Sequence, residues 1–164
     1  MLLSPEITSK SHQLTKILRS KKLCVVSAES CTGGLFSVAM TEIPGASDVF
    51  ERGFITYSNE SKIELLTVPT FYIEDYGAVS LETAAAMAEG ALLMSKADIS
   101  IAITGIAGPD GGSDDKPVGT VFISSAIRSG KTSYEQHAFS GSRHSIRTKC
   151  VEAAFDLLIK KLGE

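Results

Sequence analysis

The chain has no tryptophan, few cysteines and no long apolar run, and each shortage excludes a class of protein. Its 164 residues contain three cysteines, none in a CxxC pair. An odd number of unpaired cysteines argues against a disulfide framework and favours a reducing compartment. No apolar stretch reaches membrane-spanning length, and residues 1–20 lack the apolar core of a signal peptide. We therefore expect a cytoplasmic protein that does not contact a membrane.

The chain also has no large excess of charge of either sign. The chain carries 16 Lys and Arg against 19 Asp and Glu, a net charge of −3, with no long run of either sign. A nucleic-acid surface needs a clustered basic patch, so we expect no nucleic-acid partner. The three histidines are scattered, and no HExxH motif, EF-hand loop or zinc-ligand spacing is present, so we expect no metal site. A small anionic ligand remains compatible with this composition.

The length fits a single domain, residues 1–164. Periodicity and turn residues predict helices that alternate with strands until a late hairpin. This order indicates an α/β fold, a three-layer α/β/α sandwich with a mixed, mostly parallel sheet. The expected helices are 7–20, 35–42, 60–66, 81–95 and 142–162, and the expected strands are 22–28, 53–57, 98–104, 120–126 and 132–139.

Two helix starts have clear capping residues. Asn59 is expected to cap the short helix 60–66, and Ser80 is expected to cap the Ala-rich helix 81–95. Apolar residues near Phe71 and Tyr72 lie between these two helices. Together with the Ala-rich helix they suggest a homodimer, although a place in the core explains both features equally well.

The most informative segment is 28–34, which reads AESCTGG. It joins an apolar strand to an amphipathic helix, so Ser30 lies at a strand-to-helix turn. Free backbone N–H groups there, near Gly33 and Gly34, favour a phosphate or an oxyanion. Ser30 is therefore a candidate nucleophile. The alternative is a Gly-rich turn that only caps the helix.

Other polar groups follow the ends of the remaining strands. Ligands of open α/β sheets bind beyond the carboxyl ends of the strands, so Tyr57 and Thr104 are expected near Ser30. The loop 105–118, with Gly105 and Gly108, is neither a Walker A loop nor a GxGxxG motif. Its N–H groups are expected to surround a phosphate, the alternative being a surface loop.

A serine nucleophile needs a base, and none of the histidines has an obvious place beside Ser30. Lys62, on the short helix after Tyr57, can act as that base if burial lowers its pKa. The alternative is an ordinary solvated lysine. Arg143 and Arg147, one turn apart at the start of the last helix, oppose the helix dipole and so suggest an anion site. Two solvated arginines explain the pair equally well.

Four motifs in fixed order carry a family resemblance. They are 28–34 (AESCTGG), 54–62 (FITYSNESK), 76–80 (YGAVS), and 104–112 (TGIAGPDGG) with 116–120 (KPVGT). Over residues 7–162 the chain resembles the C-terminal domain family of the competence/damage-inducible protein CinA, in its stand-alone form. That family includes nicotinamide-nucleotide amidohydrolases. The resemblance implies a three-layer fold with a five-stranded mixed sheet.

The resemblance also implies a reaction and its residues. The carboxamide of nicotinamide mononucleotide would be hydrolysed to nicotinate mononucleotide and ammonia, in pyridine-nucleotide salvage and without a cofactor. Ser30 would be the nucleophile, Lys62 its base, and Tyr57 would assist Ser30 or position the substrate. Substrate-binding groups would be Thr104 and Arg143, with the backbone of Gly33, Gly34, Gly105 and Gly108.

One position departs from the family pattern. Family members commonly have Asp where this chain has Ser142, which can still cap the helix. The departure concerns substrate affinity more than the nucleophile. Cys31, beside Ser30, is a weaker rival nucleophile. Two further hypotheses remain open: a nucleotide-binding or regulatory module without activity, and an amidase for a different amide.

Overall fold

The computed structural model describes residues 3–163. Its sheet has five strands in the order β2-β1-β3-β4-β5. β1 pairs in parallel with β2 and β3, whereas β4 is antiparallel to both β3 and β5. β5 therefore points in the same direction as β1, and the predicted mixed, mostly parallel sheet is confirmed. The strands are β1 (Val25–Glu29), β2 (Phe50–Ile55), β3 (Ile99–Gly105), β4 (Thr120–Ser125) and β5 (Ser133–Ala138).

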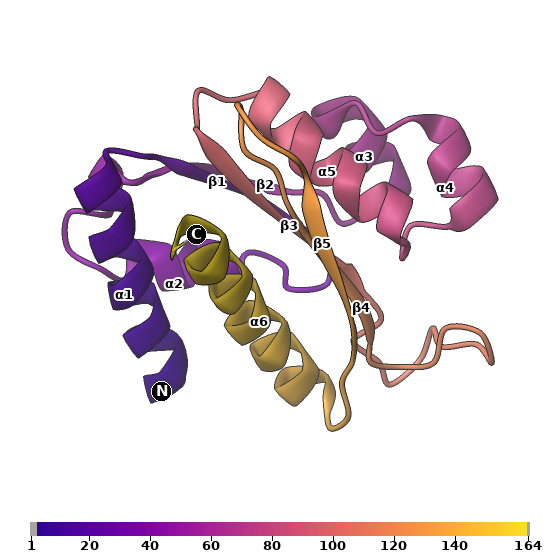
Figure 1. The fold of residues 1–164 in the computed structure, drawn as a ribbon. Helices are drawn as coiled ribbons and strands as arrows, with labels where there is room; N and C mark the ends of the chain where they lie inside the picture. Colours follow the sequence, from indigo (N-terminus) through magenta and orange to yellow (C-terminus); the bar gives the residue numbers. More distant parts are fainter. Residues whose placement is uncertain (1–2, 164) are drawn as a thin grey trace.

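Helices cover both faces of the sheet, which confirms the predicted three-layer sandwich (Figure 1). One face carries α1, α2 and α6, and the other carries α3, α4 and α5. A 3₁₀ turn, η1 (Ala46–Asp48), precedes β2. The helices are α1 (Pro5–Lys21), α2 (Leu35–Thr41), α3 (Asn59–Leu66), α4 (Thr70–Tyr76), α5 (Leu81–Leu93) and α6 (Arg143–Gly163).

Each face of the sheet has its own apolar core. Under α1, α2 and α6 the core includes Phe36 and Phe155, whose rings stack with centroids 4.7 Å apart. Under α5 it is built from small and medium side chains, such as Met87 and Ala88 against Ala102 of β3. The Ala-rich face of α5 is thus used within the molecule. The homodimer stays a prediction, and the exposed ring of Phe71 is the part of its argument that remains.

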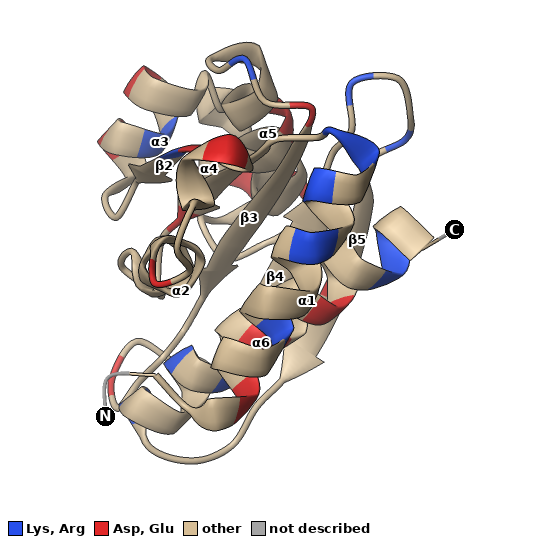
Figure 2. Ribbon diagram, turned by 90° about the vertical axis from the view of Figure 1, so that its left-hand side faces the viewer, with Lys and Arg blue, Asp and Glu red and all other residues tan. Residues whose placement is uncertain are grey.

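Local sequence explains where the first helix begins and ends. The Ser4 hydroxyl accepts a hydrogen bond from the Ile7 N–H at 3.1 Å, and Pro5 occupies the first helical position, as is common at helix starts. Arg19 and Lys21 lie in the last turn of α1, where cations interact favourably with the helix dipole (blue in Figure 2). Ser80 caps α5 as predicted, by accepting from the Thr83 N–H.

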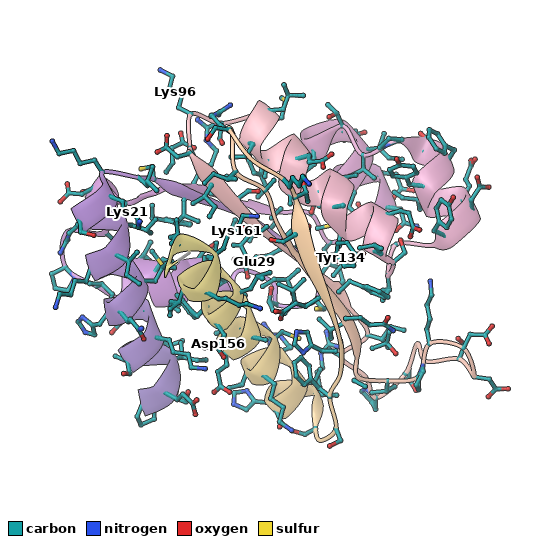
Figure 3. All side chains as sticks on the ribbon, viewed as in Figure 1. Lys21, Glu29, Lys96, Tyr134, Asp156 and Lys161 are labelled. Carbon is teal, nitrogen blue, oxygen red and sulfur yellow. The ribbon has the colours of Figure 1, made fainter. Side chains whose placement is uncertain are left out.

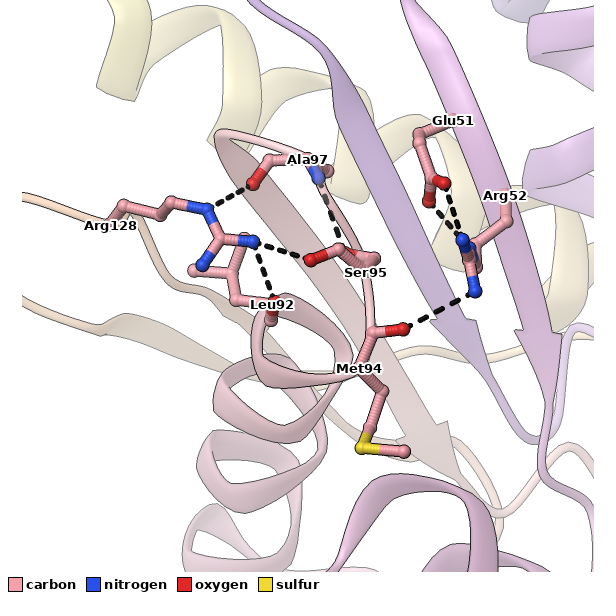
Figure 4. A network of polar contacts seen from close by, with 7 residues as sticks. All are labelled: Glu51, Arg52, Leu92, Met94, Ser95, Ala97 and Arg128. Atoms are coloured by element: carbon pink, nitrogen blue, oxygen red, sulfur yellow. Dashed lines mark hydrogen bonds and ion pairs between the residues drawn. The ribbon is translucent and has the colours of Figure 1, made fainter.

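The turn between α5 and β3 is held by arginines (Figure 4). Arg128 donates to three carbonyl oxygens there, those of Leu92, Ser95 and Ala97. Arg52 of β2 donates to the Met94 carbonyl at 3.3 Å. These contacts fix the start of β3, so that its other end presents Thr104 at a defined place.

Three local predictions were wrong or incomplete. The cap of α3 is Ser58, which accepts from the Ser61 N–H, and Asn59 is already the first helical residue. The second strand ends at Ile55, so Tyr57 lies beyond it rather than within it. Helix α4 was not predicted; it is only seven residues long and none of its residues is buried. Within residues 3–163, no helix is long and apolar enough to cross a membrane.

Candidate active site

Six of the expected site residues line one cavity of about 200 Å³ beyond the carboxyl ends of β1 and β3. The expected convergence on one rim is therefore confirmed, while the chemical role of each residue remains a prediction. These six are Ser30, Tyr57, Lys62, Thr104, Gly105 and Arg143. The cavity also touches Cys31, Asn59, Ala78, Val79 and Ala107.

Lys62 is buried at the bottom of this site. The residue is only 1% exposed to solvent, and its Nζ lies 3.0 Å from the Ser30 Oγ. The same Nζ donates to the carbonyl oxygens of Thr56 at 2.8 Å and Tyr57 at 3.1 Å. The reading of Lys62 as a solvated helix lysine is thus wrong, since α3 turns this side chain inward.

Burial lowers the pKa of Lys62 to about 8, although the negative charge of the nearby Cys31 side chain in its ionised form partly opposes this shift. Removal from water disfavours the charged ammonium. A neutral amine has two N–H groups and one lone pair. The two nearest carbonyls take the N–H groups, and the lone pair is then available to the Ser30 hydroxyl. This arrangement suits a general base.

Glu29, the residue before Ser30, is fully buried and binds the start of α2 (labelled in Figure 3). Its carboxylate accepts hydrogen bonds from the backbone N–H groups of Gly34, Phe36 and Ser37. It also accepts from the hydroxyls of Thr32 at 2.8 Å and Ser37 at 2.6 Å. The helix N-terminus is an anion site, as predicted, but a side chain of the protein fills it.

The expectation that the N–H groups of Gly33 and Gly34 are free to bind substrate is wrong. The Gly34 N–H donates to Glu29, and the Gly33 N–H donates to the Ser30 carbonyl at 3.0 Å. Neither N–H is free to hold an oxyanion or a phosphate. Both glycines instead have positive φ, +57° and +95°, a conformation that glycine adopts at low cost. Their role is to let the chain turn after Ser30.

Arg147 holds the same turn from the other side. Its guanidinium donates to the carbonyl oxygens of Cys31 at 3.1 Å and Thr32 at 2.7 Å. The expected anion site at the paired arginines therefore does not include Arg147, whose donors face the turn. Glu29 accepts from N–H groups at and after the turn that follows Ser30, residues 31–34, and Arg147 donates to carbonyls of the same turn. The position of Ser30 is thus fixed from both sides.

Arg143 and Tyr57 meet at the mouth of the cavity. Arg143 donates to the Tyr57 hydroxyl at 3.1 Å and to the Gly108 carbonyl at 2.7 Å. Tyr57 is 62% exposed, and its hydroxyl contacts Arg143 while its carbonyl contacts Lys62. Ser142 caps α6 by accepting from the Ser145 N–H, so a carboxylate is not needed at that position to start the helix.

Thr104 and the glycine loop shape the opposite wall. The Thr104 hydroxyl donates to the Ala78 carbonyl at 2.8 Å and so holds the segment before α5. The loop returns to β4, because the Ile106 N–H donates to Thr120 and the Gly119 N–H donates back to Ile106. Gly105 and Gly108 are also required sterically, since an added Cβ would lie 2.7 Å and 2.5 Å from valine side chains.

Some cavity residues lie within the family motifs, but no role was predicted for them. Ala78, Val79 and Ala107 line the cavity with apolar surface that no motif chemistry marks. Glu29 did give a signal, because it is the one acid of a buried strand, but sequence reasoning assigned it no role. Within residues 3–163, no group of three or more His, Cys, Asp or Glu side chains is placed to hold a metal ion.

A larger cavity, of about 370 Å³, lies between β5 and the end of α6. Tyr134 and Lys161, labelled in Figure 3, are among its lining residues. Lys161 donates to the Lys131 carbonyl and the Ser133 hydroxyl, so part of its role is to hold the β4–β5 turn. The smaller cavity contains the buried serine–lysine contact, and chemistry therefore favours it as the active site.

Comparison with known proteins shows which family the chain belongs to. A family model described as the CinA C-terminal domain matches residues 7–162. The chain belongs to this family. Nicotinamide-nucleotide amidohydrolase PncC of Escherichia coli K12 is 42% identical over 153 residues, which are 93% of each chain. The crystal structure of CihA from Agrobacterium tumefaciens superposes with a TM-score of 0.97 at 41% identity, covering 100% of this chain and 99% of the other.

Other relatives are much longer. A putative competence-damage inducible protein of Caldicellulosiruptor bescii is 51% identical over 146 residues, which are 89% of this chain and 35% of that protein. A CinA-like protein of Geobacter sulfurreducens is 47% identical over 149 residues, 36% of its length. The chain thus spans about a third of the length of these relatives.

Proposed function

We propose that this CinA-family protein hydrolyses the carboxamide of nicotinamide mononucleotide to nicotinate mononucleotide and ammonia. The observation that carries the proposal is the buried contact of 3.0 Å between the Ser30 Oγ and the Lys62 Nζ. The name of the E. coli relative, which matches along 93% of both chains, supports the substrate. We place the reaction in cytoplasmic pyridine-nucleotide salvage, without a cofactor.

In the proposed first step Ser30 attacks the amide carbon while Lys62 accepts the hydroxyl proton. The tetrahedral intermediate collapses when Lys62 returns that proton to the nitrogen, and ammonia leaves. An ester of Ser30 with nicotinate mononucleotide remains. Water then attacks this acyl-enzyme, with Lys62 again accepting the proton and returning it to Ser30.

The developing oxyanion needs donors other than Gly33 and Gly34. We assign it to the backbone N–H groups of Cys31 and Thr32. In the described part of the chain these two N–H groups donate to no other residue. The N–H that follows the nucleophile is the usual donor at a strand-to-helix turn. One such donor lowers the barrier by roughly 3–4 kcal/mol.

The cavity accommodates only part of the nucleotide. Its volume of about 200 Å³ is below the usual range of roughly 300–1,000 Å³ for ligand sites. We therefore place the nicotinamide ring inside and the ribose phosphate at the mouth. There the Arg143 guanidinium binds the phosphate, and the exposed Tyr57 ring packs against the substrate.

The test is ammonia release from nicotinamide mononucleotide by the wild type, Ser30→Ala and Lys62→Ala. We expect release by the wild type and at least a hundredfold loss in each variant, with unchanged circular dichroism. Cys31→Ala, made beside them, is expected to retain turnover, because Ser30 is the nucleophile. Calorimetric binding by the wild type without ammonia release would contradict the proposal. That outcome would favour a nucleotide-binding module or an amidase for a different amide.

A further inference from the structure

Asn59 lines the active-site cavity, yet neither the fold nor the proposed reaction uses its side chain. The sequence suggested a capping role, but Ser58 is the cap of α3 and Asn59 is the first helical residue. Asn59 is exposed and belongs to the cavity lining together with Ser30 and Lys62. Its amide is therefore placed where a ligand in the cavity meets it.

The hydrogen bonding of Asn59 differs from that of the hydroxyl, amine and guanidinium groups around it. Each of those groups contacts another residue of the protein; they belong to Ser30, Tyr57, Lys62, Thr104 and Arg143. Within residues 3–163, the Asn59 side chain makes no hydrogen bond. A side-chain amide offers one acceptor oxygen and two N–H donors, and all of these are available to a ligand.

The place of Asn59 on α3 indicates which part of a substrate it faces. Asn59 and Lys62 are three residues apart, and residues at this spacing lie on the same side of a helix. Lys62 is buried beside the Ser30 Oγ, where the reacting carbon must lie, whereas Asn59 is exposed. Three residues advance the helix by about 4.5 Å. Asn59 thus lies toward the mouth, beyond the point of reaction.

The ribose of nicotinamide mononucleotide joins the ring to the phosphate. With the ring inside the cavity and the phosphate at Arg143, the ribose passes the mouth, where Asn59 lies. Ribose carries two neighbouring hydroxyls, each of which both donates and accepts. The Asn59 amide can donate to one of them and accept from the other, whereas a guanidinium such as that of Arg143 only donates.

We infer that Asn59 binds the two ribose hydroxyls and so determines the specificity of this site for a ribonucleotide. The inference rests on the proposed function, from which it takes the places of the ring and the phosphate. The contact is remote from the amide carbon, so it stabilises the bound substrate and the transition state alike. Its loss should raise KM more than it lowers kcat.

The first test is calorimetric binding to the full chain carrying Ser30→Ala, which binds substrate without turnover. The ligands are nicotinamide mononucleotide and its analogue whose ribose lacks both hydroxyls. Adding Asn59→Ala should weaken binding of the nucleotide about tenfold, since two neutral hydrogen bonds are lost. Binding of the analogue should change less than twofold, because the partners of Asn59 are already absent.

The second test is ammonia release with Ser30 intact. In Asn59→Ala we expect KM for nicotinamide mononucleotide to rise about tenfold and kcat to fall less than twofold. Gln13→Ala is the matched control, because it removes an exposed amide from α1, on the other face of the sheet (Figure 1). This variant should keep the kinetics of the wild type.

Three outcomes would overturn the inference. The first is equal weakening of both ligands by Asn59→Ala, since the lost contact would then involve another part of the substrate. The second is nucleotide binding as tight as in Ser30→Ala alone, and the third is a fall in kcat without a rise in KM. Nucleotide binding by the wild type without ammonia release would count only against the proposed function, and calorimetry would still decide the role of Asn59.

Discussion

Glu29 and Lys62 are both buried ionisable groups, and their surroundings differ. Glu29 faces backbone N–H groups at the start of α2, which carry partial positive charge. Lys62 faces neutral oxygens, three carbonyls and the Ser30 hydroxyl. The carboxylate has partners that match its charge, and it stabilises the fold at the start of α2. The amine is only partly matched, its pKa falls to about 8, and it is available for chemistry.

Replacement of Lys62 should have the largest effect, and in opposite directions on activity and stability. In Lys62→Met we expect turnover to fall about 10²- to 10⁴-fold, since the general base is lost. We expect the free energy of unfolding at pH 7 to rise by about 1–3 kcal/mol, because the variant no longer buries an ammonium group. Urea unfolding and ammonia release measure the two effects.

The pH dependence of unfolding tests whether the lowered pKa of Lys62 causes this gain in stability. The folded pKa of Lys62, about 8, lies below its ordinary value of 10.5, so the unfolded chain binds more protons between these pH values. Wild-type stability should therefore rise from pH 8 to pH 10.5 relative to Lys62→Met. Lys96→Met, at an exposed lysine, should follow the wild type. Equal pH dependence in Lys62→Met and the wild type would contradict this account of Lys62.

Replacement of Glu29 should damage the fold. Glu29→Ala leaves buried N–H and hydroxyl groups without an acceptor, so we expect a loss of about 3–5 kcal/mol in the free energy of unfolding. Urea denaturation at pH 7 measures it. Glu64→Ala, at an exposed acid of α3, should cost less than about 0.5 kcal/mol. A loss below 1 kcal/mol in Glu29→Ala would remove the contrast between the two buried groups.

The smallest effect concerns the start of the helix that carries Lys62. Ser58→Ala should cost about 1 kcal/mol, because the Ser61 N–H loses its acceptor. Asn59→Ala should change stability by only a few tenths of a kcal/mol, since Asn59 is the first helical residue. Thermal unfolding of the two variants distinguishes them. A larger loss in Asn59→Ala would restore the capping role predicted for Asn59.

Sequence patterns predicted the sheet and its helix layers, because periodicity and turn residues are local properties of the chain. The residues alone left the place of Lys62 open, and the family resemblance implied its pairing with Ser30. The contacts of Glu29 and Arg147 were not predictable in this way. Arg147 reaches the turn after Ser30 only because α6 packs against that turn. Glu29 reaches the start of α2 only because the turn folds back over the end of β1. The sequence marks a helix N-terminus as an anion site but does not identify the anion that fills it.

The central claim is that a buried, neutral Lys62 activates Ser30, and the pH profile of kcat/KM for nicotinamide mononucleotide tests it most directly. With a free-enzyme pKa of about 8, kcat/KM should rise about tenfold per pH unit below that value and level off above it. A profile that is flat from about pH 6 to 9, or that still rises toward the ordinary lysine pKa of about 10.4, would contradict the claim.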